Sequence, residues 1–405
     1  MRRINKKRVF SGISLVSISS LVVAACGSGS SSSTTVTTAK GASVSISSTS
    51  FDRSFSAMTA IKGLVPQGKG MVAVILPDTV TSARYTEFDA PFLTKAFTMA
   101  GLSSSQFVVQ NAQGSDATEL SLAESDISKG ATVLAVDPLD SGVGLQIEKY
   151  ANSHGVRMIN YDRLTLGSSS KNYYVSFNNV EVGKLIGQGF TSCVASWHLA
   201  KPQVLVMRGS PTDNNATLFA QGYNTVLQPY FSSGKYVKVA YPAGTWQPSV
   251  ALTEFQGEYT AHPNINSVVM PNDENAAPVI NYLKTLHIPP KTFPVTGQDA
   301  TLAGLQNILS GYQCGTVYKP IYLEAQATVA LALYLRAGLT PPASLLNGKT
   351  YDSVSHNQIP SVLLTPIWVT PQNMNATVVK DNFVPASQLC AAPYASMCTA
   401  AGITP

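Results

Sequence analysis

The 405-residue chain is poor in charge and in cysteine, and its one N-terminal apolar run is too short and too rich in serine for a comfortable membrane span. Only 12% of the residues are charged, which disfavours long solvated helices and coiled coils. The net charge of +5 comes entirely from five basic residues among the first eight, and beyond them 22 basic side chains balance 22 acidic ones. A balanced chain has no general attraction for nucleic acid, so no nucleic-acid partner is expected.

Catalytic signatures are also missing. There is no Gly-x-Ser-x-Gly turn, no Cys-x-x-Cys pair and no second glycine to make "GSSSK" a phosphate loop. The five histidines lack metal-ligand spacing: His154, His198, His262, His287 and His356. Glycosidases use two carboxyl groups for catalysis, and Asp162 with Asp299 could form such a pair. Each has a neighbouring cation or amide that keeps its pKa low, whereas a general acid needs a raised pKa. The sequence therefore predicts no enzyme, no metal site and no cofactor.

The first residues are typical of an export signal. A basic start and an apolar run end in "VAAC", which resembles a bacterial lipobox with Cys26 as the lipidated residue. The Gly/Ser/Thr-rich segment that follows has the composition of a flexible tether. We therefore expect a lipoprotein signal peptide over 1–25, a tether over 26–55 and an extracytoplasmic protein anchored to the cell membrane. The alternative is an ordinary signal peptide with an incidental cysteine.

The remaining four cysteines form an even set in a chain expected to reach an oxidising compartment, which favours structural disulfides. Four cysteines allow three connectivities, and the sequence alone leaves the choice open. We favour Cys390 with Cys398, which closes a short loop in a Pro/Ala/Ser-rich tail, and hence Cys193 with Cys314.

From Met71 onward, short apolar runs alternate with longer stretches of helical spacing. The alternation predicts an α/β protein with parallel sheets, and the length predicts two domains. The predicted strands are "MVAVILP", "ATVLAVDP", "VRMINYD", "QVLVMRG", "INSVVMP", "TFPVTG" and "GTVYK", and the predicted helices span 87–101, 141–154, 179–197, 214–229, 274–287 and 320–338.

Polar residues follow these apolar runs, at the carboxyl ends where open α/β sheets bind ligands. A single polar tip can have a purely structural role. Asp162 and Arg163, for example, form either an ion pair at a strand end or two contacts to a ligand. Asp213 suits a helix N-cap as well as a ligand contact, and Trp246 belongs either to the core or to the cleft. Asp78, Asp140 and Asn178 are either cleft-edge or capping residues. Seven such tips together predict one polar cleft between two sheets.

The chain from about Met71 to Phe383 resembles type I periplasmic binding proteins, specifically the D-xylose-binding branch of the sugar receptors of ABC transporters. The resemblance rests on "DTVTSARYTEFD", "NYDRL", "YYVSFNNVEVGKL", "GSPTDNNATLF", "PNDENAA", "TGQDATLAGLQ", "TVYKPI", "IPSVLLTPIWV" and "TVVKDNF", in matching order and spacing. It implies two doubly wound parallel-sheet lobes joined by a three-stranded hinge, in a monomer. We expect lobe 1 over 56–164 plus 320–350, lobe 2 over 165–319 plus 351–390, and a tail over 391–405.

Ten residues match the family's sugar contacts, with Tyr85 standing where the family has a Trp. They are Arg84, Tyr85, Asp162, Arg163, Asp213, Asn215, Trp246, Asn272, Asp299 and Lys319. Their chemistry suits a pyranose, because carboxylates accept from sugar hydroxyls, Arg and Lys donate to them, and aromatic rings cover the apolar faces. The three Asp and three cations among them would keep a dry cleft electrically balanced.

The resemblance implies an extracytoplasmic receptor that binds a D-xylose-type monosaccharide by closing two lobes around it and delivers it to an ABC permease. The identity of the sugar stays open among related aldoses. The alternative output is a sugar sensor that presents its closed form to a chemoreceptor or a histidine kinase.

Overall fold

The computed structural model describes residues 46–404, so the expected signal peptide and Cys26 lie outside the described part. Within residues 46–404, no helix combines the length and the apolar character needed to cross a membrane.

The larger of two β-sheet systems, which we call the first lobe, contains seven strands in the order β10-β11-β5-β4-β3-β1-β2. All neighbours in it run parallel except β10 and β11. Its strands are β1 Met71–Leu76, β2 Phe107–Asn111, β3 Ala131–Val136, β4 Arg157–Tyr161, β5 Tyr173–Phe177, β10 Gly348–Tyr351 and β11 Gln358–Leu364. Its helices are α1 Ser56–Ala60, the 3-10 helix η1 Lys62–Gln67, the π-helix η2 Tyr85–Asp89, α2 Ala90–Met99, α3 Asp116–Ser128, α4 Ser141–Ser153 and α10 Ile321–Arg336.

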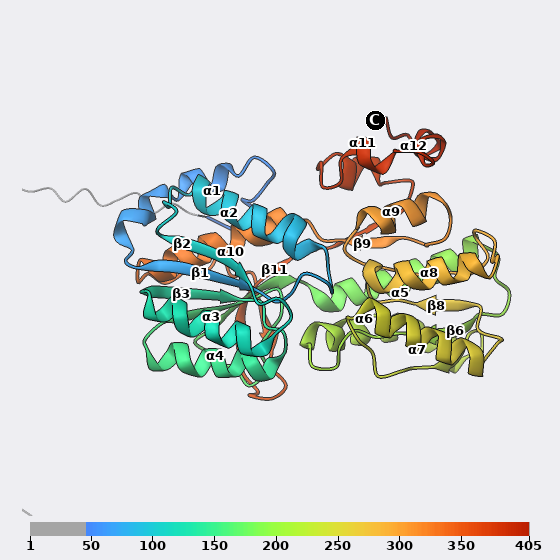
Figure 1. Cartoon of the computed structure of the whole chain (residues 1–405), viewed down its shortest axis with the longest axis horizontal. Coiled ribbons are helices and arrows are strands. Elements are labelled where there is room, and N and C mark those ends of the chain that lie inside the picture. Colours follow the sequence, from blue (N-terminus) through green and yellow to red (C-terminus); the bar gives the residue numbers. More distant parts are fainter. Residues whose placement is uncertain (1–45, 405) are drawn as a thin grey trace, which may run out of the picture. The chain divides into compact units, whose positions relative to one another are not determined.

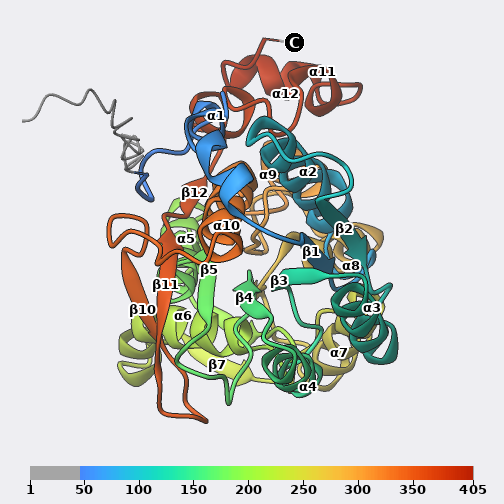
Figure 2. The ribbon, with the colours of Figure 1, turned by 90° about the vertical axis from the view of Figure 1, so that its left-hand side faces the viewer.

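Strand β1 explains why helices cover both faces of this sheet. It is a continuous apolar run, as expected for a parallel strand buried on both sides. Val72, Val74 and Leu76 join one apolar cluster together with α2 and α10. Ala73 and Ile75 join a second cluster with α3 and α4. Figure 2 shows the resulting three layers, with α3 and α4 on one side of the strands and α2 and α10 on the other.

The second lobe is built on a smaller sheet system. Strands β7-β6-β8 form one sheet and β12-β9 another, and single parallel bridges at Val295 and Gln298 connect them. Its strands are β6 Gln203–Val206, β7 Val237–Ala240, β8 Ser267–Val269, β9 Thr316–Tyr318 and β12 Ile367–Val369. Its helices are α5 Asn179–Ser196, α6 Asn214–Ser232, α7 Pro248–Ala261, α8 Asp273–Thr285 and α9 Leu302–Leu309. Helices α5 and α6 pack backbone to backbone, since a Cβ at Gly183 would lie 2.1 Å from the Phe219 carbonyl oxygen.

The chain passes between the two lobes three times: from β5 to α5, from β9 to α10 and from β11 to β12 (Figure 1). This agrees with the expected three-stranded hinge, but the strand membership differs from the expected domain bounds. Strands β5 and β11 belong to the first-lobe sheet, whereas they lie in 165–319 and 351–390, the ranges expected for the second lobe. The reason is that β5 pairs with both β4 and β11, so the crossings follow Phe177 and Leu364.

Both ends of the described chain are packed against the body. Ile46, Phe51 and Phe55 are buried, although 26–55 is expected to be a tether. The apolar side chains within the serine-rich stretch account for this difference, because they join the core around α1 and α10. At the other end, the π-helix η3 Asn375–Val379 leads to α11 Ala386–Leu389 and α12 Ala395–Ala400, which Figure 1 shows beside α9.

The structure contains the two disulfides that the sequence favours. Cys193 on α5 is bonded to Cys314, and Cys390 is bonded to Cys398. The first bond ties α5 to the loop before β9 within the second lobe, and the second bond closes the C-terminal segment between α11 and α12.

Candidate functional site

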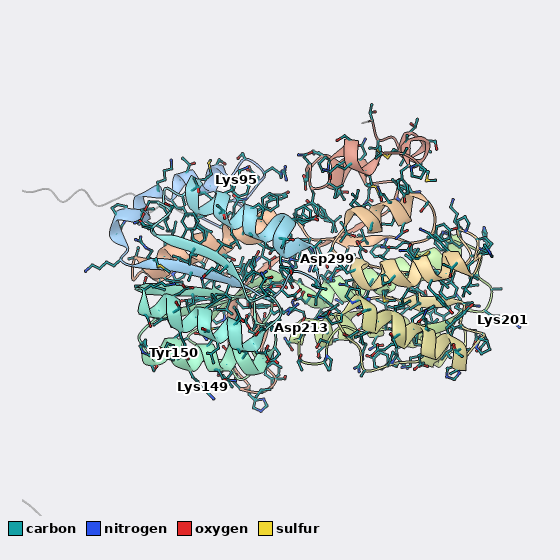
Figure 3. The ribbon with its side chains drawn as sticks, viewed as in Figure 1. Lys95, Lys149, Tyr150, Lys201, Asp213 and Asp299 are labelled. Carbon is teal, nitrogen blue, oxygen red and sulfur yellow. A yellow bond between two sulfur atoms is a disulfide. The ribbon has the colours of Figure 1, made fainter. Side chains whose placement is uncertain are left out.

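All ten residues expected from the sequence line one polar cavity between the lobes. Its empty volume is about 330 Å³. Arg84 and Tyr85 come from the start of η2, and Asp162 and Arg163 follow β4. The second lobe and the hinge supply the others from helix N-termini and strand ends: Asp213, Asn215, Trp246, Asn272, Asp299 and Lys319. Figure 3 labels Asp213 and Asp299 at the junction of the lobes.

Arg84 is held by three carboxylates. Its guanidinium makes two hydrogen bonds to Asp89, at 2.9 and 2.8 Å. It also donates to Asp162 at 2.6 Å and to Glu324 on α10 at 2.7 Å. The Tyr161 hydroxyl also donates to Asp89. These contacts fix the arginine rigidly, because each adds a charge-assisted hydrogen bond in a buried position.

Arg163 links the two lobes electrostatically. Its Nε lies 3.6 Å from Asp137 in the first lobe and 3.4 Å from Asp213 in the second. Its terminal nitrogens donate to the Pro138 carbonyl at 3.2 Å and to the Tyr85 hydroxyl at 2.9 Å. The hydroxyl that distinguishes Tyr85 from the family's Trp therefore serves as an acceptor for Arg163.

Asp213 is both an N-cap and a cavity residue, so its two interpretations hold together. One oxygen accepts from the Asn215 amide nitrogen at the start of α6, and the other accepts from Trp246 Nε1 at 2.9 Å. Trp246 lies against Gly209, where a Cβ would come within 2.1 Å of the indole. The indole also meets the Phe219 ring edge to face, with 6.3 Å between centroids. Trp246 is half-buried and lines the cavity.

The hinge side of the cavity is closed by a network of neutral side chains. Asn215 Nδ2 donates to the Asp162 carbonyl at 2.9 Å, across the two lobes. Its Oδ1 accepts from the Tyr174 hydroxyl and from Asn179 Nδ2, each at 2.9 Å. This network brings β4, β5 and the first turns of α5 and α6 together beneath the cavity.

Two of the cavity aspartates have backbones in the left-handed region, with φ of 54° at Asp162 and 90° at Asp299. Such conformations cost on the order of 1–3 kcal/mol each and cluster at ligand sites. Asp299 is paired with Lys319 at 2.9 Å. The neighbouring Asp273 carboxyl fastens the Asp299 loop, because it accepts from the Thr301 amide nitrogen at 3.0 Å and from Gln313 Nε2 at 2.7 Å.

The cations set the charge state of the cavity. Burial opposes ionisation of Asp162, but Arg84, Lys319 and Arg163 outweigh it and hold its pKa below the usual value. Burial also opposes the charge of Lys319, and Asp299 outweighs it, so the pKa of Lys319 is raised. The expected balance of three Asp and three cations omits Asp89, Asp137 and Glu324. Burial raises the pKa of Asp137 and of Glu324, while Arg163 beside Asp137 and Arg84 beside Glu324 act in the opposite direction.

The cavity is also lined by four residues that are not among the ten: Thr81, Ser82, Phe219 and Gln298. Gln298 belongs to the polar segment "TGQD" after an apolar run, and this pattern indicates a cavity residue. The pattern around Phe219 indicates only an ordinary core residue of a helix. The three uncertain residues all make capping or turn contacts. Asp140 accepts from two amide nitrogens at the start of α4, Asn178 caps α5 and Asp78 accepts from the Thr81 amide nitrogen.

Comparison with known proteins gives a consistent family. Residues 72–340 match the model of the periplasmic binding protein domain. The chain is 37% identical over 285 residues to the D-xylose-binding periplasmic protein of Escherichia coli, covering 69% of this chain and 82% of that protein. It is 34% identical to the protein of the same name from Haemophilus influenzae, covering 72% and 84%. A solved ABC transporter solute-binding protein from Clostridium phytofermentans, with bound β-D-glucose, superposes with a TM-score of 0.70 at 25% identity, covering 79% and 99%.

Proposed function

The chain belongs to the periplasmic binding protein domain family, and from this premise we propose that it is the receptor of an ABC importer for D-xylose or a closely related aldose. The observation that carries the proposal is the convergence of ten polar and aromatic side chains, from both lobes, on one cavity. The relatives that carry the D-xylose name add support for the ligand class.

The cavity offers each part of a pyranose a partner. Asp162, Asp213 and Asp299 present acceptors, while Arg84 and Lys319 present donors, and Asn272 presents both functions. Tyr85 and Trp246 supply aromatic faces for the C–H surfaces of the ring. Since Arg84, Asp162 and Trp246 are already fixed by protein contacts, the sugar meets a preorganised site and loses little affinity to side-chain ordering.

Binding proceeds by closure of the lobes. A sugar that touches Asp162 from the first lobe and Asp213 from the second makes both sets of contacts only in the closed form, so it shifts the population toward that form. The permease then recognises the closed protein. The family and the named relatives are binding proteins, and we propose that this protein likewise binds its sugar without turnover.

Titration calorimetry against a panel of monosaccharides tests the ligand class. D-xylose is expected to bind tightly, with L-arabinose, D-ribose and D-glucose as comparisons that rank the specificity. Chromatography of D-xylose and of xylose oligomers after incubation is expected to return every sugar intact. A protein that binds none of the panel, or that releases smaller sugars, contradicts the proposal.

We further propose that Cys26 carries the lipid anchor, on the strength of the "VAAC" motif. Growth of expressing cells with a labelled fatty acid is expected to label the wild-type protein and not the Cys26→Ser variant. Cys26→Ser is also expected to move the protein from the membrane fraction to the soluble fraction. Equal labelling of both proteins excludes Cys26 as the anchor.

A further inference from the structure

A second set of contacts joins the lobes outside the ten cavity residues. Glu274 lies in the first turn of α8 in the second lobe. Its Oε1 accepts from the Ala83 amide nitrogen at 2.9 Å and from the Ser82 hydroxyl at 3.2 Å, both in the first lobe. These donors stand immediately before Arg84, so Glu274 reaches the segment that presents the arginine to the cavity.

The other carboxylate oxygen of Glu274 faces the ligand set. Oε2 accepts from Asn272 Nδ2 at 3.2 Å, while Asn272 Oδ1 accepts from the Asn275 amide nitrogen as the N-cap of α8. Both functional atoms of the Asn272 amide are thus engaged by α8, which fixes its orientation. One carboxylate therefore holds a cavity residue of its own lobe and the facing segment of the other lobe.

Glu274 also stands between two cavities. Ser82 and Asn272 line the sugar cavity, and the next residue in each segment, Ala83 and Asp273, lines a second cavity of about 820 Å³. This second cavity is largely apolar at its α9 side, through Leu302 and Ala303, and it includes Glu274 itself. The hydrogen bonds of Glu274 to Ser82 and Ala83 therefore form part of the wall that separates the bound ligand from the outer cavity.

We propose that Glu274 is a closure residue, which binds the Ser82–Ala83 segment when the lobes meet and holds Asn272 in place for the ligand. The proposal rests on the proposed sugar-binding function for its ligand and on the interlobe hydrogen bonds for its mechanism. Its first-lobe partner at position 83 is a backbone N–H, which any residue there except proline supplies.

Glu274→Ala removes both acceptor oxygens. Because Ser82, Ala83 and Asn272 then lose their acceptor, we expect D-xylose affinity to fall about tenfold, with faster dissociation and an unchanged melting temperature. Glu274→Gln keeps one oxygen for Ala83 but presents an N–H to Asn272. Its D-xylose affinity is therefore expected to lie between that of Glu274→Ala and that of the wild type. Glu87→Ala is the matched control, because exposed Glu87 lines the same outer cavity from the first lobe.

A sugar-independent measurement separates this inference from the proposed function. Dyes attached through encoded azide side chains at positions 149 and 201 report the distance between the lobes, because Lys149 is exposed on α4 and Lys201 is exposed at the far end of the second lobe (Figure 3). In the full-length protein, Glu274→Ala is expected to lower the closed fraction in single-molecule energy transfer, and Glu87→Ala is not.

If the wild-type protein binds no sugar, the proposed function fails, and the distance distributions alone decide the role of Glu274. If Glu274→Ala has the affinity and the closed fraction of the wild type, the closure role is overturned while sugar binding stands. A lower melting temperature in Glu274→Ala, with an unchanged closed fraction, also overturns it, since that result assigns the residue to stability alone.

Discussion

The indole nitrogen of Trp246 lies 2.9 Å from Asp213 Oδ2, so an aromatic cavity residue is oriented by a charged one. Asp213 in turn lies 3.4 Å from Arg163 of the opposite lobe. Because Asp213 contacts both Trp246 and Arg163, a displacement of the indole is expected to shift Asp213 and so disturb its ion pair with Arg163.

Gly209 provides a test of that coupling. A Cβ at this position would overlap the indole of Trp246, so Gly209→Ala must move the ring and weaken its bond to Asp213. We expect sugar affinity to fall at least about tenfold, the size of one charge-assisted hydrogen bond. Calorimetry and Trp fluorescence check the result.

Gly257→Ala on α7 is the control: nothing lies within 4 Å of its Cβ, and an alanine in a helix is expected to be neutral or stabilising.

Arg84 is expected to be essential for stability as well as for binding. Arg84→Met leaves Asp89, Asp162 and Glu324 buried without their shared cation, and breaking a buried ion pair costs about 3–5 kcal/mol. Urea unfolding should show a loss in the free energy of unfolding of at least this size. Lys201→Met, at an exposed position, is expected to stay within about 0.5 kcal/mol of the wild type. An Arg84→Met variant of unchanged stability would contradict the importance of the triple ion pair.

The two disulfides are expected to differ in their contribution. The Cys193–Cys314 bond spans a sequence separation of 121, and the Cys390–Cys398 bond spans only 8. Chain-entropy arguments then predict losses of about 5 and about 2.5 kcal/mol for the paired Cys→Ser variants. Denaturant unfolding of the two double variants compares them directly. Equal losses would show that loop closure does not govern their effect.

The pH dependence of sugar binding should report on Glu274. Burial raises its pKa from the ordinary 4.5 to about 8, and the nearby Asp299 and Asp273 carboxylates act in the same direction. Asp299 is paired with Lys319, and Glu87 is the acidic group on the first-lobe side of the outer cavity. Closure therefore favours the protonated form, so affinity is highest near pH 5 and declines as the pH rises toward 8.

Calorimetry from pH 5 to pH 8.5 measures this decline in the wild type and in Glu274→Gln. The variant cannot ionise at this position, so its profile is expected to be flatter. Asp273, whose pKa burial raises to about 7, titrates in both proteins, so the comparison reports the loss of Glu274 and of its interaction with Asp273. Identical profiles for the two proteins would assign the pH effect to other groups.

Much of the architecture follows from local sequence patterns. The predicted runs "MVAVILP", "ATVLAVDP", "VRMINYD", "QVLVMRG", "INSVVMP" and "GTVYK" contain β1, β3, β4, β6, β8 and β9, because buried strands are largely apolar. The run "TFPVTG" contributes only a bridge at Val295, with Pro294 beside it. Strands β2, β5, β7, β10, β11 and β12 are not among the predicted runs. In β7 the sequence "VKVA" is short and half-exposed, so it carries little apolar signal.

Sheet membership was less accessible from the sequence. Nothing in "YYVSF" distinguishes a strand that pairs with β4 from one that pairs with β6, and the domain bounds were displaced for that reason. The cavity residues were easier to predict because polar tips follow apolar strands and the family motifs are specific. Glu274 lies within the motif "PNDENAA", but the motif does not reveal its partner in the first lobe, the backbone N–H of Ala83.

The three crossings between the lobes determine the order in which the protein can mature during synthesis. Strand β11 inserts between β10 and β5, yet it is translated after all the second-lobe strands except β12. The sheet that begins with β1 thus remains without its last two strands until the ribosome has passed Leu364. The first-lobe sheet is therefore completed only after most of the second lobe has been made, and its unpaired β5 edge must be shielded from other chains in the meantime.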